Sequence, residues 1–404
     1  MGLVRQASVL LLWAALVTSR GLFAQGAPGA IPATARADEA RVALRPVDLR
    51  YVQPALPQLL PSSASVKALY VNAWAFGSSK LWQLVRLADE TEVNAFVVDV
   101  KDDTGCLLYP SAVPTAQQIG ANQCNRGRDA RARLDTLLLH GIYPIARIVV
   151  AKDPLLAEHR PQWSVHLADG ELWRDRIGSA WVDAYNDSVW VYSAQLAQEA
   201  LRMGFAEVQF DYVRFPDEPR ERLATAVFSA RRSGDTPRIA VRRNVRLLKS
   251  LLAPLGAPVT FDIFGLTASA TDDMGIGQVW EDFSSVADVV LPMVYPSHYP
   301  PGAYGFAWPN GQPYKVVRRA LEEALDRSRA PDAAEIRPYL QAFTLGRRLP
   351  HYTPLEIREQ IRATEELGIA SWVLWNPRSV YQRDALRPYR TALQVASELT
   401  RGGQ

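Results

Sequence analysis

The sequence predicts an α/β protein whose chain closes into a (β/α)8 TIM barrel, preceded by a signal peptide and a Pro/Ala-rich arm. From residue 66 onward, short β-branched or aromatic runs alternate with helical patterns. Eight strand runs can be counted, which is the number that closes a parallel sheet into a barrel. Helical patterns end in Gly just before strands in "HGIYPI", "MGFAEV" and "LGIASW", a junction typical of parallel-sheet proteins. An open doubly wound sheet is the alternative, but the GxGxxG and GxxxxGK[ST] phosphate loops are missing from the sequence.

Composition excludes several classes of protein. Of the 404 residues, 48% are hydrophobic and 22% charged, which rules out wholesale disorder, collagen-like and coiled-coil structures. A net charge of +3, from 45 basic and 42 acidic residues, argues against a nucleic-acid binder, which would show a clustered basic excess. With five His and two Cys, we expect no structural metal site, and we expect no cofactor.

Residues 1–24 are expected to form a secretory signal peptide. Arg5 gives a positive start, Ala7–Val17 is apolar, and the small residue Ala24 follows. The apolar run is shorter than the about 20 residues that a membrane span requires, although a short uncleaved anchor is the alternative. We therefore expect a secreted or periplasmic protein with no integral membrane span after signal removal.

The arm and the two cysteines follow from the same export hypothesis. Residues 25–65 are rich in Pro and Ala and are expected to form a linker or N-terminal arm before a barrel domain at 66–400. Cys106 and Cys124 lie in one Gly- and Pro-containing loop. In an oxidising compartment we expect them to form a disulfide, the alternative being two free thiols.

The expected elements alternate along the barrel. Strands are predicted at 66–76, 94–102, 143–152, 206–215, 258–266, 288–295, 336–344 and 370–376. Helices are predicted at 79–92, 128–140, 187–203, 353–367 and, with the least regular pattern, 272–285. The clearest helix start is Thr353 as N-cap followed by Pro354, and Gly368 marks the end of the same helix.

Charged residues inside these strands identify a candidate site, because the carboxyl ends of barrel strands hold the active site. In the second strand, the period of two places Val97, Asp99 and Lys101 on the inner face. Asp99 and Lys101 are therefore expected to form an inward ion pair. This pair either supports the barrel interior or contacts substrate.

The fourth strand gives the strongest signal. Its alternation places Val208, Phe210 and Tyr212 outside and Glu207, Gln209 and Asp211 inside. Asp211 is nearest the rim, with Arg214 just beyond it, so Asp211 is a candidate catalytic carboxylate and Arg214 a candidate substrate contact. The alternative for Asp211 is a salt bridge to Arg147, which points inward from the third strand.

A second acid comes from the neighbouring fifth strand, where Asp262 shares the inner face with Thr260 and Phe264. Asp211 and Asp262 can therefore face one cleft. Paired carboxylates are what glycoside hydrolysis needs, one as acid and the other as base or nucleophile. Asp102, at the end of the second strand, is a further candidate for the acid.

Aromatic residues gather at the predicted rim. Tyr295 and Trp375 follow the sixth and eighth strands, and such rings suit stacking against sugar C–H faces, although ordinary core packing is the alternative. His298 is either a proton shuttle or a loop histidine with satisfied hydrogen bonds. Tyr70 and Asn376 complete the expected substrate contacts.

Four strings, "NAFVVDVKDDTG", "GFAEVQFDYVRFP", "LPMVYPSHY" and "SWVLWNP", each lie at the end of a different predicted strand. Together they resemble a glycosyl hydrolase family of secreted bacterial TIM-barrel proteins, over about residues 66–385. The resemblance implies a carbohydrate-active barrel. Similarity to barrel glycosidases implies a catalytic Asp at the end of strand four, here Asp211, and adds Asp99, Asp262, Tyr295 and Trp375 to the cleft. Many barrel glycosidases carry Glu on strand five, where this chain has Asp262, so the acid assignment stays open.

Three functional hypotheses follow. The first is a secreted glycoside hydrolase acting on an oligo- or polysaccharide through paired carboxylates. The second is a non-catalytic glycan-binding barrel, which would keep the aromatic rim without needing the acid pair. The third, a metal-dependent deacetylase or an esterase, is disfavoured because the five His show no HxxxH spacing and no GxSxG occurs.

Overall fold

The computed structural model describes residues 65–389, apart from residues 125, 128 and 347–348. The expected signal peptide lies outside the described residues, as does the expected arm except for its last residue. Among the helices of the described ranges, none combines the length and apolar character needed to cross a membrane.

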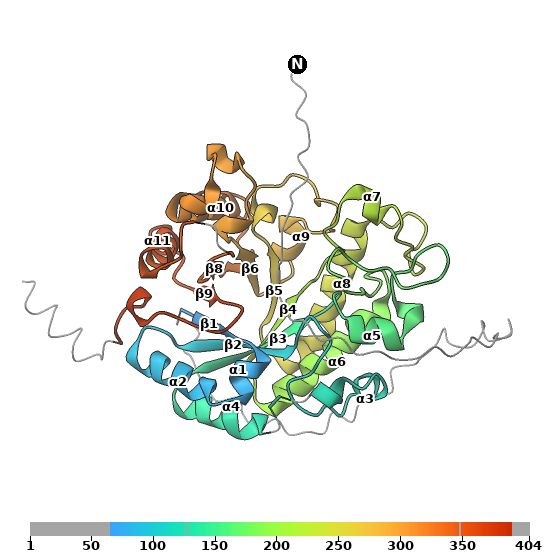
Figure 1. The fold of residues 1–404 in the computed structure, drawn as a ribbon, viewed down its shortest axis with the longest axis horizontal. Coiled ribbons are helices and arrows are strands. Elements are labelled where there is room, and N and C mark those ends of the chain that lie inside the picture. Colours follow the sequence, from blue (N-terminus) through green and yellow to red (C-terminus); the bar gives the residue numbers. More distant parts are fainter. Residues whose placement is uncertain (1–64, 125, 128, 347–348, 390–404) are drawn as a thin grey trace, which may run out of the picture.

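The strands form one closed parallel barrel, as predicted (Figure 1). β1 pairs with β2 and with β9, and β5 pairs with β4 and with β6, so the sheet closes on itself. The bounds are β1 (Lys67–Val71), β2 (Ala95–Lys101), β3 (Tyr143–Val149), β4 (Glu207–Asp211), β5 (Val259–Phe264), β6 (Val289–Met293), β7 (Glu335–Ile336), β8 (Tyr339–Gln341) and β9 (Trp372–Trp375).

The seventh strand position is split, which differs from the single strand predicted over 336–344. β7 and β8 both pair with β6, and Arg337 and Pro338 separate them. Pro338 has no N–H to continue the ladder, so the strand is interrupted there. The two short strands together fill one of the eight positions around the barrel.

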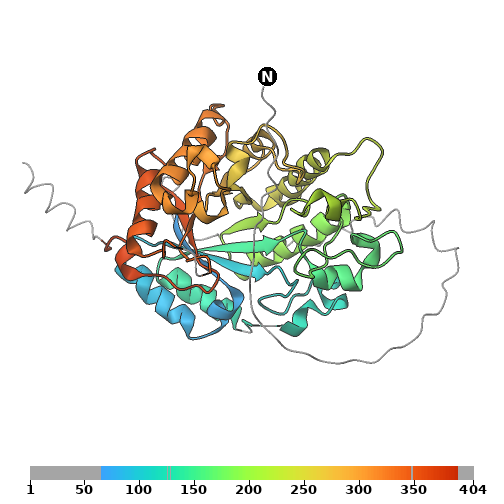
Figure 2. The same cartoon turned by 45° about the horizontal axis from the view of Figure 1, so that its top comes forward.

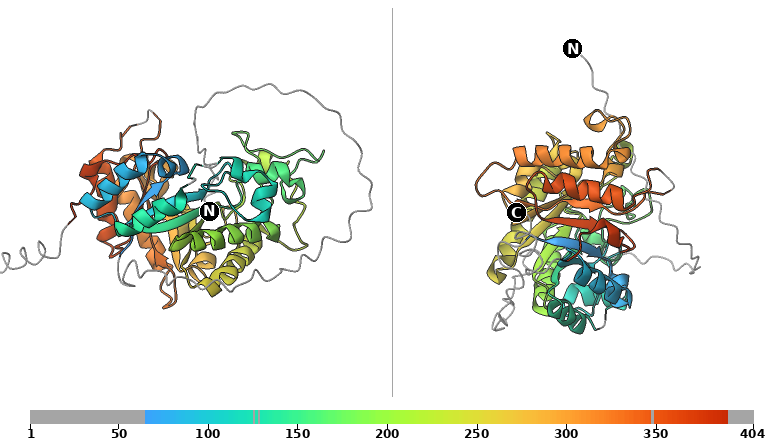
Figure 3. Two further views of the ribbon diagram at one scale, coloured as in Figure 1. Left: turned by 90° about the horizontal axis from the view of Figure 1, so that it is seen from below. Right: turned by 90° about the vertical axis from the view of Figure 1, so that its left-hand side faces the viewer.

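Helices surround the barrel on its outside (Figures 1 and 2). α10 and α11 pack side by side, and the last strand lies beside the first, which joins the two ends of the described chain (Figure 3). The bounds are α1 (Ala73–Gly77), α2 (Lys80–Glu90), α3 (Pro114–Gln118), α4 (Ala130–Leu139), α5 (Pro154–His159), α6 (Asp187–Met203), α7 (Arg220–Leu223), α8 (Pro237–Leu252), α9 (Trp280–Ser284), α10 (Pro313–Asp326) and α11 (Pro354–Glu365).

Two predicted elements need correction. The first predicted strand ends at Val71, because the Asn72 side chain accepts a hydrogen bond from the Ala75 N–H at 2.8 Å and caps α1. The helix predicted over 272–285 is reduced to α9, since Met274 adopts a φ of 50° and Gly275 a φ of 72°. α8 and α10 fill ranges to which the pattern assigns no helix, although both carry buried residues at three- and four-residue spacing.

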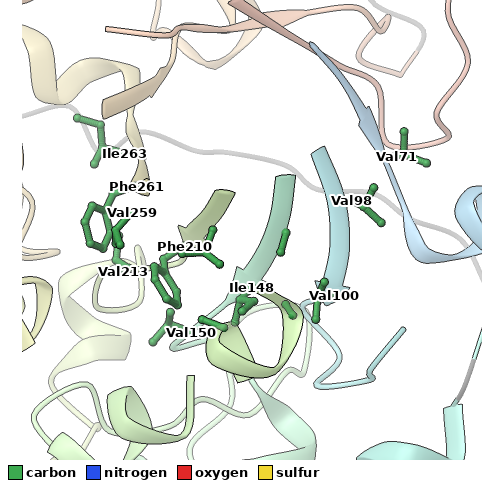
Figure 4. Close-up of a cluster of buried hydrophobic side chains, with 14 of the residues drawn as sticks. Val71, Val98, Val100, Ile148, Val150, Phe210, Val213, Val259, Phe261 and Ile263 are labelled. Atoms are coloured by element: carbon green, nitrogen blue, oxygen red, sulfur yellow. The ribbon is translucent and has the colours of Figure 1, made fainter. Parts of the chain in front are cut away.

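Alternation along the strands separates two apolar clusters, as predicted. Val98 and Phe210 belong to the cluster between strands and helices, part of which Figure 4 shows. Val97 belongs to a smaller cluster inside the barrel. Phe210 stacks on Phe261 of the next strand at 5.8 Å between ring centres. This packing fixes which face of each strand turns inward, and it therefore directs the acidic residues into the barrel.

The expected disulfide is present in the structure. Cys106 and Cys124 are bonded, and they are 18 residues apart in the chain. The bond closes the loop that leaves β2.

Candidate active site

A cavity of about 670 Å³ opens at the carboxyl ends of the strands. Arg147 of β3, Asp211 of β4, Asp262 of β5 and Trp375 of β9 line it, and the loop after β6 adds Tyr295. The two candidate carboxylates therefore share one cavity with the aromatic side chains expected at the rim.

One arginine joins three aspartates in this region. Arg147 Nη1 donates to Asp99 Oδ1 at 2.5 Å, and Nη2 donates to Asp211 Oδ2. Its Nε lies 3.6 Å from Asp262 Oδ2. We refer to Asp99, Arg147, Asp211 and Asp262 as the carboxylate cluster. The salt bridge considered as the alternative for Asp211 is thus present, and Asp211 also lines the cavity.

Asp211 has a partner on each of its carboxylate oxygens. Oδ2 accepts from Arg147, and Oδ1 accepts from the backbone N–H of Tyr212 at 2.5 Å. Tyr212 adopts a φ of 53°, a region that non-glycine residues rarely occupy. This turn ends β4 at Asp211 and aims the Tyr212 N–H back at the carboxylate. It also brings the Tyr212 side chain to the cavity, while the same side chain packs against the apolar cluster outside the strands, where it was predicted.

Asp262 is in a different environment. Its side chain is almost fully buried, Oδ2 accepts from Gln209 Nε2 at 3.0 Å, and Oδ1 has no hydrogen-bond partner in the described part of the chain. Burial raises the pKa of Asp262 well above its usual range, and the neighbouring Asp211 raises the same pKa further. Asp262 therefore holds its proton where an ordinary aspartate would have lost it.

Asp99 lies beneath the cavity and does not line it. It bonds Arg147 and accepts a hydrogen bond from the Tyr70 hydroxyl. Burial raises the pKa of Asp99 to about 6, an effect that Arg147 partly offsets. Both Asp99 and Tyr70, predicted as substrate contacts, are placed to support the cluster from below.

The predicted ion pair between Asp99 and Lys101 is wrong. The register between β2 and β3 shifts between these two residues, which breaks the alternation and turns Lys101 away from the barrel interior. Lys101 is fully buried, and its Nζ bonds Asp153 Oδ2 at 2.6 Å and lies 5.2 Å from the centre of the Tyr192 ring. It does not reach the cavity.

Two further predicted site residues lie outside the cavity lining. Asp102 pairs with Arg126 at 2.6 Å and accepts from Thr104, so it is not positioned as the acid. The Asn376 amide donates to the Ala342 carbonyl at 2.6 Å, and its oxygen accepts from the Arg378 N–H at 2.9 Å. Both residues organise loops rather than the cavity surface.

Tyr295, His298, Phe343 and Trp375 form an aromatic wall. Tyr295 and Trp375 stack at 5.3 Å between ring centres and an interplanar angle of 21°, and Phe343 meets Trp375 edge-on at 5.1 Å. His298 lies 5.2 Å from Tyr295, and its Nδ1 is 2.9 Å from Ser297 Oγ. Burial lowers the pKa of His298 to about 4, so the imidazole is neutral at ordinary pH.

The opposite side of the cavity carries Arg214. Its guanidinium lies over the rings of Trp181, Tyr212 and Phe264, at 5.3, 4.7 and 4.6 Å from their centres. Trp181 comes from the long insertion after β3 and is held by Asp175, whose Oδ2 accepts from the indole N–H at 3.0 Å.

Sequence reasoning missed Arg147 as a member of the site and treated it only as a possible partner of Asp211. The sequence does contain an indication of this role, since a basic residue on the inner face of β3 needs acids nearby. Gln209, which holds Asp262 and Tyr339, also carries that signal as an inward polar residue. The contribution of Phe343 to the aromatic wall has no comparable signal in the sequence.

Comparisons with known proteins give a family match and structural similarities for this chain. A family model described as "Putative glycosyl hydrolase domain" matches residues 68–381. A hypothetical protein from Ruminiclostridium thermocellum ATCC 27405 is 32% identical, over 52% of this chain and 98% of that one, with a TM-score of 0.43. The PgaB (BpsB) glycoside hydrolase domain from Bordetella bronchiseptica is 15% identical, over 80% of this chain and 99% of that one, with a TM-score of 0.51, which shows a shared fold.

The alpha-galactosidase TtGalA from Thermus thermophilus is also 15% identical, with a TM-score of 0.46. The match covers 79% of this chain, and this chain spans 60% of the length of that enzyme. Among curated proteins, no match to the chain was found.

Proposed function

The chain belongs to the family described as a putative glycosyl hydrolase domain, and from this premise we propose that it cleaves glycosidic bonds of an oligo- or polysaccharide with Asp211 and Asp262 as its catalytic pair. The observation that carries the proposal is the unequal environment of two carboxylates in one cavity. Asp211 is paired with Arg147, whereas Asp262 has an unpartnered oxygen and a raised pKa. Two acids in different surroundings within one cavity are the arrangement that glycoside hydrolysis uses.

In this proposal Asp262 is the general acid. Burial and the neighbouring Asp211 raise its pKa and favour its protonated form, which gives the proton to the oxygen of the leaving sugar as the glycosidic bond breaks. Its partner Gln209 holds one carboxyl oxygen, the other oxygen has no hydrogen-bond partner among the described residues, and the residue lines the cavity. Asp102, the other candidate for the acid, is paired with Arg126 away from the cavity and is not proposed for this role.

Asp211 carries the negative charge opposite the developing positive charge of the sugar ring. It acts either as the nucleophile that attacks the anomeric carbon or as the base that activates a water. A carboxylate oxygen has two lone pairs, so the hydrogen bonds from Arg147 and Tyr212 leave lone pairs free for either role. The aromatic wall supplies the stacking surface for the sugar.

We also propose that the protein acts outside the cytoplasm, with residues 1–24 as a removable signal peptide. The disulfide between Cys106 and Cys124 supports this proposal, because such bonds persist in oxidising compartments.

The test replaces Asp211 with Asn, which keeps the shape of the side chain and removes its charge. Release of reducing sugar from a panel of polysaccharides should fall by about 10²–10⁴-fold, and the far-ultraviolet circular dichroism should stay unchanged. The matched control is Asp217→Asn, an acid that lines the same cavity from the loop after β4 and should retain turnover. Unchanged turnover in the Asp211 variant would remove Asp211 from the mechanism, and glycan binding by the wild-type protein without cleavage would favour a non-catalytic glycan-binding barrel.

A further inference from the structure

Arg214 is a buried cation of the cavity that the catalytic proposal does not use. It lies three residues after Asp211, lines the same cavity, and has 8% of its surface exposed. The other cavity arginines are paired with acids, Arg147 with the carboxylate cluster and Arg176 with Glu218 at 2.8 Å. Within the described residues, Arg214 has no such carboxylate, and its one hydrogen bond runs from Nη1 to the Phe215 carbonyl at 2.9 Å.

The surroundings of Arg214 leave its hydrogen-bonding edge available. A guanidinium group has five N–H donors, and here one of them has a protein acceptor. The rings of Trp181, Tyr212 and Phe264 cover the group with apolar surface and favour its charge through cation–π contact. These rings accept no conventional hydrogen bonds, so the remaining N–H groups need an acceptor that enters the cavity.

Three acids near Arg214 form no ion pair with it in the described part of the chain. Both oxygens of Asp175 are used, since Oδ2 accepts from the Trp181 indole and Oδ1 accepts from the N–H groups of Ile177 and Ser179. Glu218 is paired with Arg176. Asp217 also lines the cavity, but it is partly exposed and forms no ion pair with Arg214 in the described part of the chain. A largely buried guanidinium without a counter-charge is costly, and a ligand anion would remove this cost.

We propose that the cavity binds an acidic sugar, a uronic acid residue whose carboxylate pairs with the free edge of Arg214. This inference rests on the proposed hydrolase function and names its substrate class. A planar carboxylate matches the guanidinium fork with two parallel hydrogen bonds. The position next to Asp211 places the acidic residue beside the bond to be cleaved, and Phe264 follows Asp262 by two residues on the other side.

A second cation strengthens the preference for an anion. Lys152 lines the cavity with its Nζ 5.5 Å from the centre of the Tyr212 ring, which Arg214 also contacts. Lys152 Nζ lies 2.8 Å from Asp103 Oδ2, and the Asp103 side chain is 47% exposed. Water therefore screens the charge of Asp103 and weakens this ion pair. Two cations thus contact the one tyrosine that follows Asp211.

The experiment compares paired ligands that differ only in the carboxylate. Oligogalacturonides and oligoglucuronates are tested beside their carboxyl-reduced, neutral counterparts, with the full chain carrying Asp211→Asn so that binding is measured without cleavage. The acidic form should bind about 10–100-fold more tightly than the neutral form, as expected for a charge-assisted bidentate contact. Adding Arg214→Met should bring this ratio close to one. Adding Arg176→Met instead, which removes a cavity arginine already paired with Glu218, should leave the ratio unchanged.

The outcomes separate this inference from the proposed function. Cleavage of neutral glycans by the wild-type protein without a preference for their acidic counterparts would overturn the acidic-sugar assignment and leave the hydrolase intact. A preference that survives Arg214→Met would overturn the role of Arg214. If the wild-type protein neither binds nor cleaves any glycan of the panel, both proposals fail. Where Arg214→Met unfolds the protein, Arg214→Lys keeps the charge without the fork and should still lower the ratio.

Discussion

Replacing Arg147 with Met removes the one cation shared by the carboxylate cluster, and its effect on stability should depend on pH. Arg147 contacts Asp99, Asp211 and Asp262, and all three side chains are buried. Without the arginine, buried carboxyl groups can avoid an uncompensated charge by taking up protons. Taking up a proton costs more free energy at higher pH, so the variant should lose most stability at alkaline pH.

The size of this effect follows from Asp99. Its pKa in the folded wild-type protein is about 6. Forcing Asp99 to be neutral at pH 8, two units above that pKa, costs about 2.7 kcal/mol, whereas at pH 5 the group is already protonated and costs almost nothing. The loss in the free energy of unfolding should therefore be about 3 kcal/mol larger at pH 8 than at pH 5. Loss of the ion pair with Asp211 adds to the destabilisation at both pH values.

Urea denaturation followed by tryptophan fluorescence measures this difference directly. The control is Arg337→Met. Arg337 Nη1 forms another buried ion pair, 2.8 Å from Glu207 Oε1, and neither residue lines the cavity. Both variants should be less stable than wild type, but only Arg147→Met should lose hydrolytic activity while still folded. An equal loss of stability at pH 5 and pH 8 would refute the reasoning, because it would mean that Arg147 does not stabilise the charged form of Asp99.

Two further predictions concern stability. Burial raises the pKa of Asp99 to about 6 and lowers the pKa of His298 to about 4. Asp99 contributes to the free energy of unfolding below about pH 4, and this contribution is lost as the pH rises through 6. His298 contributes above about pH 6.5, and its contribution is lost as the pH falls through 4. Each contribution amounts to at most about 3 kcal/mol. In urea unfolding between pH 4 and 7, Asp99→Asn should therefore gain stability with rising pH and His298→Gln should lose it, and equal slopes in wild type and both variants would contradict this. Replacing Cys106 and Cys124 with Ser should lower the free energy of unfolding by about 3 kcal/mol, because their bond closes a long loop; reduced wild type should match that variant, and a variant as stable as the oxidised protein would exclude the effect.

Alternation along single strands was enough to predict which way most site residues point. Asp211 and Asp262 face the barrel interior as the period of two requires, and the outer residues Val98 and Phe210 pack under the helices. The rule fails at Lys101, where the register between β2 and β3 shifts and the parity of the strand reverses. Nothing in the local sequence marks that shift, since it arises from the pairing of two strands.

The contacts between strands were beyond sequence reasoning for a related reason. Arg147 reaches Asp99 because the two residues lie opposite each other on β2 and β3. It reaches Asp211 because Asp211 lies opposite Val149, which is two residues further along β3 and on the same face as Arg147. Register is a property of the assembled barrel. The stacking of Tyr295 on Trp375 likewise depends on the order of the strands, because Tyr295 follows β6, Trp375 ends β9, and β8 lies between these two strands.

The different surroundings of the two proposed catalytic acids can be traced to where their strands end. Asp211 is the last residue of β4, so the Tyr212 N–H is released from the sheet and donates to the carboxylate. Asp262 lies two residues before the end of β5, and the first N–H released there, that of Phe264, donates to Gln278 at 2.9 Å instead. Asp262 thus lacks a backbone donor, keeps one oxygen unpartnered among the described residues, and is left with burial as the dominant influence on its pKa. A difference of two residues in how far each aspartate lies from the end of its strand therefore sets which of the two neighbouring aspartates serves as the proton donor in the proposed reaction.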